Sequence, residues 1–242
     1  MTQIRSLAFN AIFFAWTFLF SVSVILLGFL PRKLLQQVIS EWMRTVMTVL
    51  RWTTGIRYEV RGWEHFPTGP AIIASKHQSA WDTGIFYILC YDTAYVLKRE
   101  LTWIPFYGWV LKRVKMIAVD RSARASALKL LVRQTGAALA AGRQVVIFPE
   151  GTRRAVGAPP DYQPGVAALY RAFDVPVVPV AVNSGLYWPR RSFLKKRGTI
   201  LIEFLPHIPK GLDRKAFMAE LEGRIEEGTN RLVAEGQRTL SP

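Results

Sequence analysis

Cysteine and histidine are scarce in this chain of 242 residues, which holds one cysteine, Cys90, and three histidines, His65, His77 and His207. A single cysteine excludes an internal disulfide. Three scattered histidines lack the spacing of metal ligands, so we expect no metal and no cofactor. Cys90 lies in an apolar run that predicts the middle of a helix, where a thiol packs as a small inert hydrophobe. Catalytic chemistry therefore has to come from few side chains.

Acidic residues are also few, with 17 Asp and Glu against 32 Lys and Arg and a formal net charge of +15 at pH 7. Such a surface attracts anionic partners, which include nucleic acids, lipid headgroups and phosphorylated ligands. Half of the residues are hydrophobic and the mean hydropathy is +0.16. This composition excludes a disordered or collagen-like chain, and the length suits one domain with an appendage.

Charge is absent altogether from residues 7–30. As a helix this run is about 36 Å long, enough to cross the hydrocarbon layer of a bilayer. A secretory signal has a shorter apolar region, and a buried core helix seldom runs so far without a charge, so we expect membrane insertion. Crossing the bilayer and dipping into one leaflet both fit the pattern. We expect Asn10, the only strongly polar residue of the run, to be solvated at the membrane interface.

A second helix is predicted over residues 34–50, where apolar residues recur at intervals of three and four. It would either pack on the rest of the protein or lie in the headgroup layer. Residues 1–54 are thus predicted to form a membrane-associated helical hairpin. Four basic residues follow the apolar run and one, Arg5, precedes it, which places the remainder of the chain in the cytoplasm. The four are Arg32, Lys33, Arg44 and Arg51.

Residues 55–242 alternate between strand-like and helix-like segments. Strand-like runs cover residues 57–60, 71–75, 94–97, 116–119, 144–148, 177–182 and 199–204. Helix-like stretches cover residues 81–91, 101–113, 123–141, 165–173 and 214–235. This alternation predicts an α/β domain with a central, largely parallel sheet flanked by helices. In such sheets ligands bind at the carboxyl ends of the strands.

The segment 71–82 places His77 directly after a strand and Asp82 five residues later. Five residues do not share one helix face, but the pair can meet if a helix starts between them, with Ser79 as its N-cap. Asp82 would then point back and accept a hydrogen bond from one imidazole nitrogen, leaving the other free to accept a proton. The alternative is that Asp82 only caps the helix and His77 is a loop residue.

Residues 144–153 read as a buried strand running into a tight turn, with Pro149 at its second position and Gly151 at its fourth. Arg153 follows and can grip phosphate through two parallel hydrogen bonds, and Glu150 could brace an arginine or hold a substrate hydroxyl. A turn followed by solvated arginines is the plainer interpretation. The Gly- and Pro-rich residues 154–164 predict a mobile loop beside this turn.

Other basic residues follow strands or gather among aromatics. Lys98 and Arg121 each follow a predicted strand, and they would form an anion site if they converge on one sheet edge. Residues 188–197 combine five basic residues with Trp188 and Phe193. Such a cluster can bind nucleic acid, but beside a membrane hairpin it favours anionic headgroups.

Four blocks stand together in order: HQSAWD at 77–82, DR at 120–121, FPEGTR at 148–153 and VPVVPV at 175–180. In this combination the chain resembles the glycerolipid acyltransferases over about residues 60–204. The resemblance implies that His77 and Asp82 are the catalytic pair. It further implies an acceptor-binding group and phosphate contacts. These are Glu150, Gly151, Thr152 and Arg153, with Lys98 and Arg121.

The resemblance implies transfer of an acyl chain from acyl-CoA or acyl-carrier protein to the free sn-2 hydroxyl of 1-acylglycerol-3-phosphate, giving phosphatidic acid. His77 would take the hydroxyl proton, Asp82 would fix its tautomer, and backbone amides near the His77 turn could stabilise the oxyanion. The expected partners are a lysophospholipid, an acyl thioester and a phospholipid membrane, the cell inner membrane, with the catalytic domain on its cytoplasmic face. Nucleic acid is not expected.

Alternatives remain at this level. The same chemistry could act on glycerol-3-phosphate, a lyso-ornithine lipid or another lysophospholipid, and a non-catalytic, membrane-tethered binder of anionic lipid would carry much of the same charge. The chain also departs from the family pattern, because Lys76 stands where asparagine often precedes the histidine. A lysine that many members have near Gln163 and Pro164 is absent.

Overall fold

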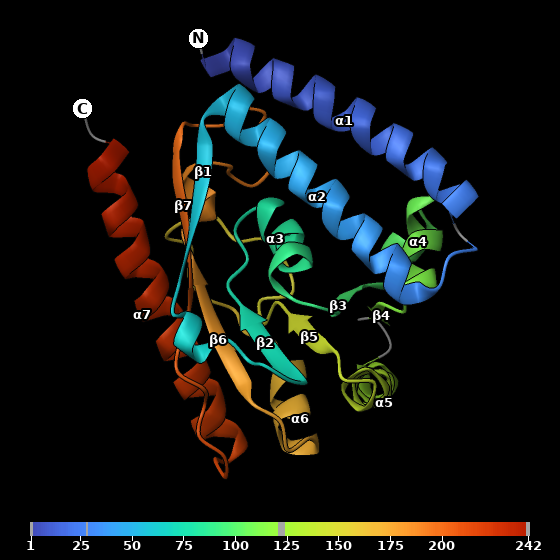
Figure 1. Ribbon diagram of the computed structural model, residues 1–242. Helices are drawn as coiled ribbons and strands as arrows, with labels where there is room; N and C mark the ends of the chain where they lie inside the picture. The colour runs from blue at the N-terminus through green and yellow to red at the C-terminus, as the bar shows by residue number, and fades with distance from the viewer. Residues whose placement is uncertain (1, 28, 121–123, 241–242) are drawn as a thin grey trace.

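The structure is a computed structural model that describes residues 2–27, 29–120 and 124–240. These residues form a seven-stranded sheet in the order β1-β7-β6-β2-β5-β3-β4 (Figure 1). The strands are β1 (Ile56–Arg61), β2 (Ala71–Ser75), β3 (Thr93–Lys98), β4 (Ile117–Val119), β5 (Gln144–Ile147), β6 (Val177–Val182) and β7 (Gly198–Phe204). Neighbouring strands are parallel except β6 and β7, so β1 and β7 run opposite to the other five. The predicted α/β class with a largely parallel sheet is confirmed.

Helices cover both faces of the sheet, because successive strand residues point to opposite sides. Ile73 belongs to the core shared with α2 (Arg32–Thr54) and α3 (Trp81–Leu89), and its neighbour Ile72 to the core on the other face. That second core is closed by α5 (Arg124–Ala140), α6 (Gly165–Ala172) and α7 (Arg214–Leu240) (Figure 1). The central strands β2, β5 and β6 are therefore buried on both faces.

The N-terminal helix α1 (Thr2–Leu27) folds back along α2 as a hairpin (Figure 1). Residues Thr2–Val24 form a helix long and apolar enough to cross a membrane by length and composition, with only 11% of the most apolar stretch buried. Its exposed large apolar side chains are Ile4, Leu7, Ile12, Phe14, Trp16, Phe18, Leu19 and Val22. The sequence left open whether α2 packs on the rest of the protein or lies in the headgroup layer. The structure shows that it packs on the protein, since Leu35, Ile39 and Leu50 lie in the domain core.

Two contacts join this hairpin to the domain at its opposite ends. Arg32, at the start of α2, and Arg143, before β5, both bind the buried Asp92 carboxylate at 2.6–3.0 Å. At the other end, the Lys195 ammonium donates to Asn10 Oδ1 at 2.7 Å, and the Lys195 amide donates to Ser6 Oγ at 2.9 Å. Burial lowers the pKa of Lys195. Lys195 therefore anchors α1 instead of facing headgroups, so that expectation is wrong, and Asn10 is hydrogen-bonded within the protein while it remains partly exposed.

Two segments differ from the sequence-based prediction. The single helix expected over 101–113 is wrong, because a 3-10 helix, η2 (Arg99–Trp103), precedes α4 (Tyr107–Arg113), and Pro105 and Phe106 interrupt the two. Cys90 ends α3 instead of lying in its middle, yet it is buried, and burial raises the pKa of its thiol to about 12. The expected inert packing of Cys90 is confirmed.

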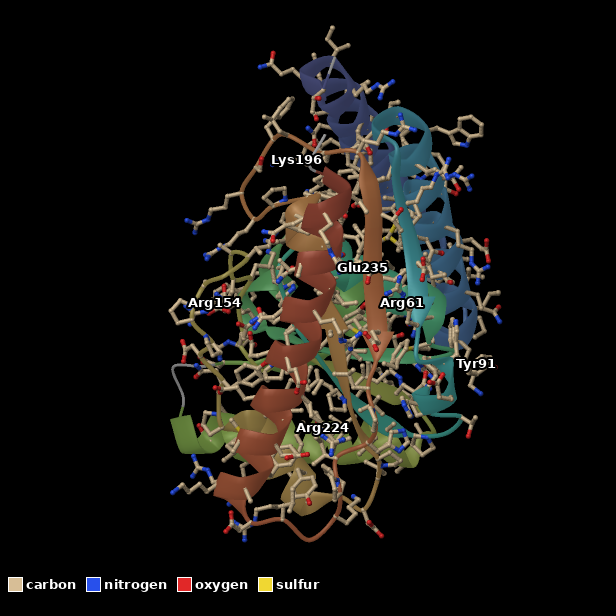
Figure 2. All side chains as sticks on the ribbon, turned by 90° about the vertical axis from the view of Figure 1, so that its left-hand side faces the viewer. Arg61, Tyr91, Arg154, Lys196, Arg224 and Glu235 are labelled. Atoms are coloured by element: carbon tan, nitrogen blue, oxygen red, sulfur yellow. The ribbon has the colours of Figure 1, made fainter. Side chains whose placement is uncertain are left out.

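The C-terminal helix α7 spans the sheet face that carries α6. Arg61 at the end of β1 and Glu235 near the end of α7 form a two-pronged ion pair at 2.8 Å (Figure 2). This contact ties the last turns of the chain to the edge strand of the sheet, far from α5 (Figure 1).

Candidate active site

One edge of the sheet gathers the residues predicted to carry chemistry. The strands β2, β5, β3 and β4 are mutually parallel neighbours, so their carboxyl ends lie at the same edge. His77 follows β2, Glu150 follows β5 and Lys98 ends β3. With about 4.8 Å between neighbouring strands, Lys98 lies about 10 Å across the edge from the line of β2. Arg121 follows β4 in sequence but lies outside the described residues.

The His77 imidazole meets the Asp82 carboxylate as the spacing predicts. Nδ1 of His77 lies 3.0 Å from Asp82 Oδ2, and the same oxygen accepts the amide hydrogens of Gln78 and Ser79 at 2.7 and 2.8 Å. The N-cap is Ala80 instead of the predicted Ser79, so the helix begins at Trp81 and Asp82 is its second residue. Asp82 makes no capping bond to the first turn of the helix; it binds the amides of the preceding turn and His77 at once.

A fourth donor completes the environment of Asp82. The Ser184 hydroxyl, which follows β6, donates to Asp82 Oδ1 at 2.5 Å, and the aspartate is fully buried. The carboxylate thus has four hydrogen-bond partners, two amides, one hydroxyl and the imidazole. An ionised carboxylate only accepts, so Nδ1 of His77 carries a hydrogen and Nε2 presents its lone pair.

The ring of His77 is fixed by packing and open at one side. It stacks on Phe148 with centroids 4.0 Å apart and planes at 18°. Its side chain is 11% exposed, and within the described residues its Nε2 makes no hydrogen bond. The structure therefore presents one oriented proton acceptor at the sheet edge.

The turn after β5 is bound directly to the His77 backbone. Gly151, with φ at 64°, donates its amide hydrogen to Phe148 at 2.8 Å and closes the predicted turn. The His77 carbonyl accepts from the Arg154 amide at 2.8 Å, and the His77 amide donates to Glu150 Oε2 at 3.4 Å. The two sequence blocks thus form one unit, and the loop expected to be mobile is hydrogen-bonded where it begins.

Glu150 has a different partner from the one predicted. Its buried carboxylate binds the Lys76 ammonium at 2.9 Å, and Lys76 also binds Glu226 of α7 at 2.6 Å. The Tyr162 hydroxyl donates to Glu226 at 2.8 Å. Burial raises the pKa of Glu150, and Lys76 opposes that shift. Glu150 therefore braces a lysine, and the expectation that it braces an arginine is wrong.

The remaining predicted residues surround this core at the surface. Arg153 and Lys98 are exposed, and neither has a hydrogen bond or ion pair to another described residue. Gly151 and Thr152, which directly precede Arg153, are partly exposed. Exposed cations without an ion pair can bind an anion, and the predicted convergence of Lys98 with Arg121 stays a prediction because Arg121 lies outside the described residues.

Backbone amides at the His77 turn are not free to stabilise an oxyanion. The amides of His77, Gln78 and Ser79 all donate within the protein, to Glu150 or Asp82. That expectation is therefore wrong. In the described part of the chain, no group of three or more His, Cys, Asp or Glu side chains could hold a metal ion.

Three residues of the site were not predicted from the sequence. Ser184 follows a strand that ends at the same edge as β2, a signal that could have been read from the segment 177–184. Glu226 lies in the middle of a long charged helix, and Tyr162 in a loop, and neither position has a local pattern that marks it. Both reach the site through tertiary folding alone.

Comparison with known proteins gives a consistent picture. Residues 57–183 match a family model described as Acyltransferase. The chain is 38% identical over 96% of its length to a 1-acyl-sn-glycerol-3-phosphate acyltransferase of Pseudomonas aeruginosa, covering 91% of that protein. It is 29% identical over 69% of its length to the human 1-acyl-sn-glycerol-3-phosphate acyltransferase alpha, covering 60% of that protein.

A solved structure shares the fold. The crystal structure of the 1-acyl-sn-glycerophosphate acyltransferase PlsC from Thermotoga maritima superposes with a TM-score of 0.77. The match covers 96% of this chain and 95% of that one, at 22% sequence identity. The two chains therefore share one fold over nearly their whole length.

Proposed function

The chain belongs to the Acyltransferase family, and we propose that it transfers a fatty acyl chain from an acyl thioester to the sn-2 hydroxyl of 1-acylglycerol-3-phosphate. The product is phosphatidic acid, and the donor is acyl-CoA or acyl-carrier protein. One observation carries the proposal: His77 Nε2 is free while Nδ1 is held by the buried Asp82. That is the arrangement of a general base.

The reaction needs only positioning and proton transfer. The acceptor oxygen attacks the thioester carbonyl carbon while its proton passes to Nε2 of His77. Asp82 stabilises the imidazolium that forms. The carbon–sulfur bond then breaks, and His77 returns the proton to the departing thiolate. Because the attacking alcohol belongs to the substrate, no acyl-enzyme is required.

The phosphate of the acceptor would bind to the cations of the same edge. Arg153 and Lys98 are exposed there and unpaired among the described residues, and Arg121 is proposed as a third contact. Gly151 and Thr152 shape the approach beside Arg153. Glu150 would serve acceptor binding indirectly, by holding the His77 amide and Lys76. No metal or further cofactor enters this mechanism.

We also propose that the protein acts on the cytoplasmic face of the cell inner membrane. The support is the exposed apolar face of α1 together with the excess of basic residues that follow it. A lysophospholipid already resides in that bilayer. Binding of nucleic acid is not part of the proposal.

The decisive test compares two histidine variants of the full chain in detergent micelles with labelled acyl-CoA and 1-acylglycerol-3-phosphate. His77→Ala should lower kcat by about 10² to 10⁴, the usual contribution of a general base. His65→Ala is the matched control, because among the described residues the side chain of His65 has one polar contact, with Glu64 at 3.8 Å. A folded His77→Ala protein with full activity would leave a non-catalytic lipid binder as the better explanation.

The acceptor is tested separately. A panel of 1-acylglycerol-3-phosphate, glycerol-3-phosphate, a lyso-ornithine lipid and a lysophosphatidylcholine, each with the same donor, should show the highest kcat/KM for the first. Preference for an acceptor without a phosphate would contradict the role given to Arg153 and Lys98.

A further inference from the structure

A cluster of exposed apolar side chains lies outside both the active site and the hairpin. Residues 103–107, Trp-Ile-Pro-Phe-Tyr, are all exposed, and we name them the aromatic tip. Trp103 is 62% exposed and Phe106 48%. Contiguous exposed apolar side chains of this kind mark interaction surfaces in proteins.

The backbone holds the tip in its exposed form. Phe106 has φ 61° and ψ −55°, and the Tyr107 amide donates to Pro105 at 2.7 Å, which together define a γ-turn of the rare, strained kind. A bulky residue adopts this conformation only where its surroundings impose it. Gly108 does so here, because its amide bonds Ile104 at 2.8 Å and an added Cβ would lie 2.2 Å from the Thr102 carbonyl oxygen.

The tip belongs to the part of the domain that meets the end of the hairpin. In Figure 1, α4, which begins within the tip, lies beside the C-terminal end of α1. Arg113 at the end of α4 donates to the Leu30 carbonyl at 3.2 Å, in the turn between α1 and α2. The neighbouring Phe29 is 91% exposed. The tip therefore lies one short helix, about 10 Å, from this turn and from the exposed apolar side of α1.

Exposed basic side chains lie on the same part of the domain as the tip. Lys112 and Lys115 are exposed in and just after α4, and Lys33 is exposed beside the turn. Tryptophan and tyrosine favour the interface between a bilayer and water, and lysines near them favour anionic headgroups. We propose that the aromatic tip inserts into the headgroup region of an anionic phospholipid bilayer, as a membrane contact separate from α1.

This second contact would orient the catalytic edge. A hairpin alone allows the domain to rock about one line of attachment. The tip follows β3, whose carboxyl end shares its edge with His77. Two contacts on the same bilayer therefore turn that edge towards the lipid, so that a lysophospholipid can reach His77 without leaving the monolayer.

The chain's single cysteine permits a direct test. Cys90 is 5% exposed, and its raised thiol pKa of about 12 keeps it unreactive, so an introduced cysteine can be labelled selectively. Phe106→Cys, carrying an environment-sensitive fluorophore, is compared with Trp63→Cys. Trp63 is 51% exposed and follows β1, at the other end of the sheet from β3 and β4.

The labelled proteins are mixed with phosphatidylcholine vesicles containing phosphatidylglycerol. The Phe106→Cys label should shift to the blue and be quenched by lipids brominated near the headgroup, and the Trp63→Cys label should not change. Equal responses at both positions would overturn the proposal. So would a blue shift that needs no vesicles and grows with protein concentration, because the tip would then contact a second copy.

A variant pair separates this proposal from the proposed reaction. Trp103→Ser with Phe106→Ser should weaken vesicle binding by about tenfold, and Trp63→Ser should leave it unchanged. Activity in detergent micelles should match the wild type in both, which also shows that they fold. Unchanged vesicle binding, or a loss of micellar activity with binding intact, would refute the membrane role. Absence of acyl transfer in the wild type would refute only the reaction.

Discussion

Removing the ammonium of Lys76 should destabilise the protein strongly. The Lys76→Met variant leaves Glu150 and Glu226 beside each other without their shared cation. The side chains of Lys76 and Glu150 are 3% and 1% exposed, so water cannot replace the ammonium at Glu150. Breaking a buried ion pair on one side costs about 3–5 kcal/mol in the free energy of unfolding. We expect a loss in that range at pH 8.

The effect of Glu226→Gln on the free energy of unfolding should have opposite signs in the wild type and in the Lys76→Met variant. In the wild type, Glu226→Gln leaves Lys76 paired with Glu150 and costs about 1 kcal/mol or less, since Glu226 is 20% exposed and borders a cavity of about 510 Å³. In the Lys76→Met background the same change removes one of two neighbouring carboxylates that have lost their ammonium partner, and it should stabilise the protein. Urea unfolding in detergent of the wild type, the two single variants and the double variant completes this double-mutant cycle.

The pH dependence provides an independent check. Burial raises the pKa of Glu150 in the folded protein. Between its ordinary value and this raised value the folded state binds more protons than the unfolded chain, so stability falls as pH rises through that window. The cost of Lys76→Met should therefore shrink at pH 5. A cost below 1 kcal/mol at pH 8, or the same sign for Glu226→Gln in both backgrounds, would refute the reasoning.

Three further predictions concern single contacts. Ser184→Ala removes a donor to the buried Asp82 carboxylate and should lower kcat by about tenfold, measured in micelles, with little change in either KM. Arg153→Ala should raise KM for the acceptor by about tenfold and leave KM for the thioester unchanged, and equal effects on both would contradict its role. Asp92→Asn should cost about 3 kcal/mol or more in urea unfolding, because the buried Arg143 and the partly buried Arg32 lose their counter-charge. Burial acts to raise the pKa of Asp92, yet its arginine partners lower it, so its contribution should persist until pH falls below about 4.

Local patterns in the sequence predict the site where one short segment builds it. The interval between His77 and Asp82, with a helix start between them, predicts their hydrogen bond to within one residue of the helix boundary. The turn from Phe148 to Gly151 is likewise predicted by its proline and glycine. Both depend on backbone geometry over a few residues, which propensity and capping rules describe well.

The partners of charged residues could not be predicted, because they come from distant parts of the chain. Lys76 departs from the usual asparagine, and its counter-charge Glu226 lies 150 residues later. Lys195 looks like a surface cation in a basic cluster, yet it anchors Asn10, 185 residues earlier. Burial of a charge shows no periodicity in sequence, since it depends on which helix the topology places above it.

That topology explains how α7 reaches the active site. Because β7 runs antiparallel to β6, it ends at the edge opposite His77, and α7 begins there. At 1.5 Å per residue its 27 residues extend for about 40 Å back across the sheet, so the helix passes beneath Lys76 at Glu226 and beside Asn183 at Gly236. A parallel β7 would start α7 at the catalytic edge and carry it away from Lys76. The one antiparallel pairing of the sheet thus places the buried counter-charge under the residue that precedes the catalytic histidine.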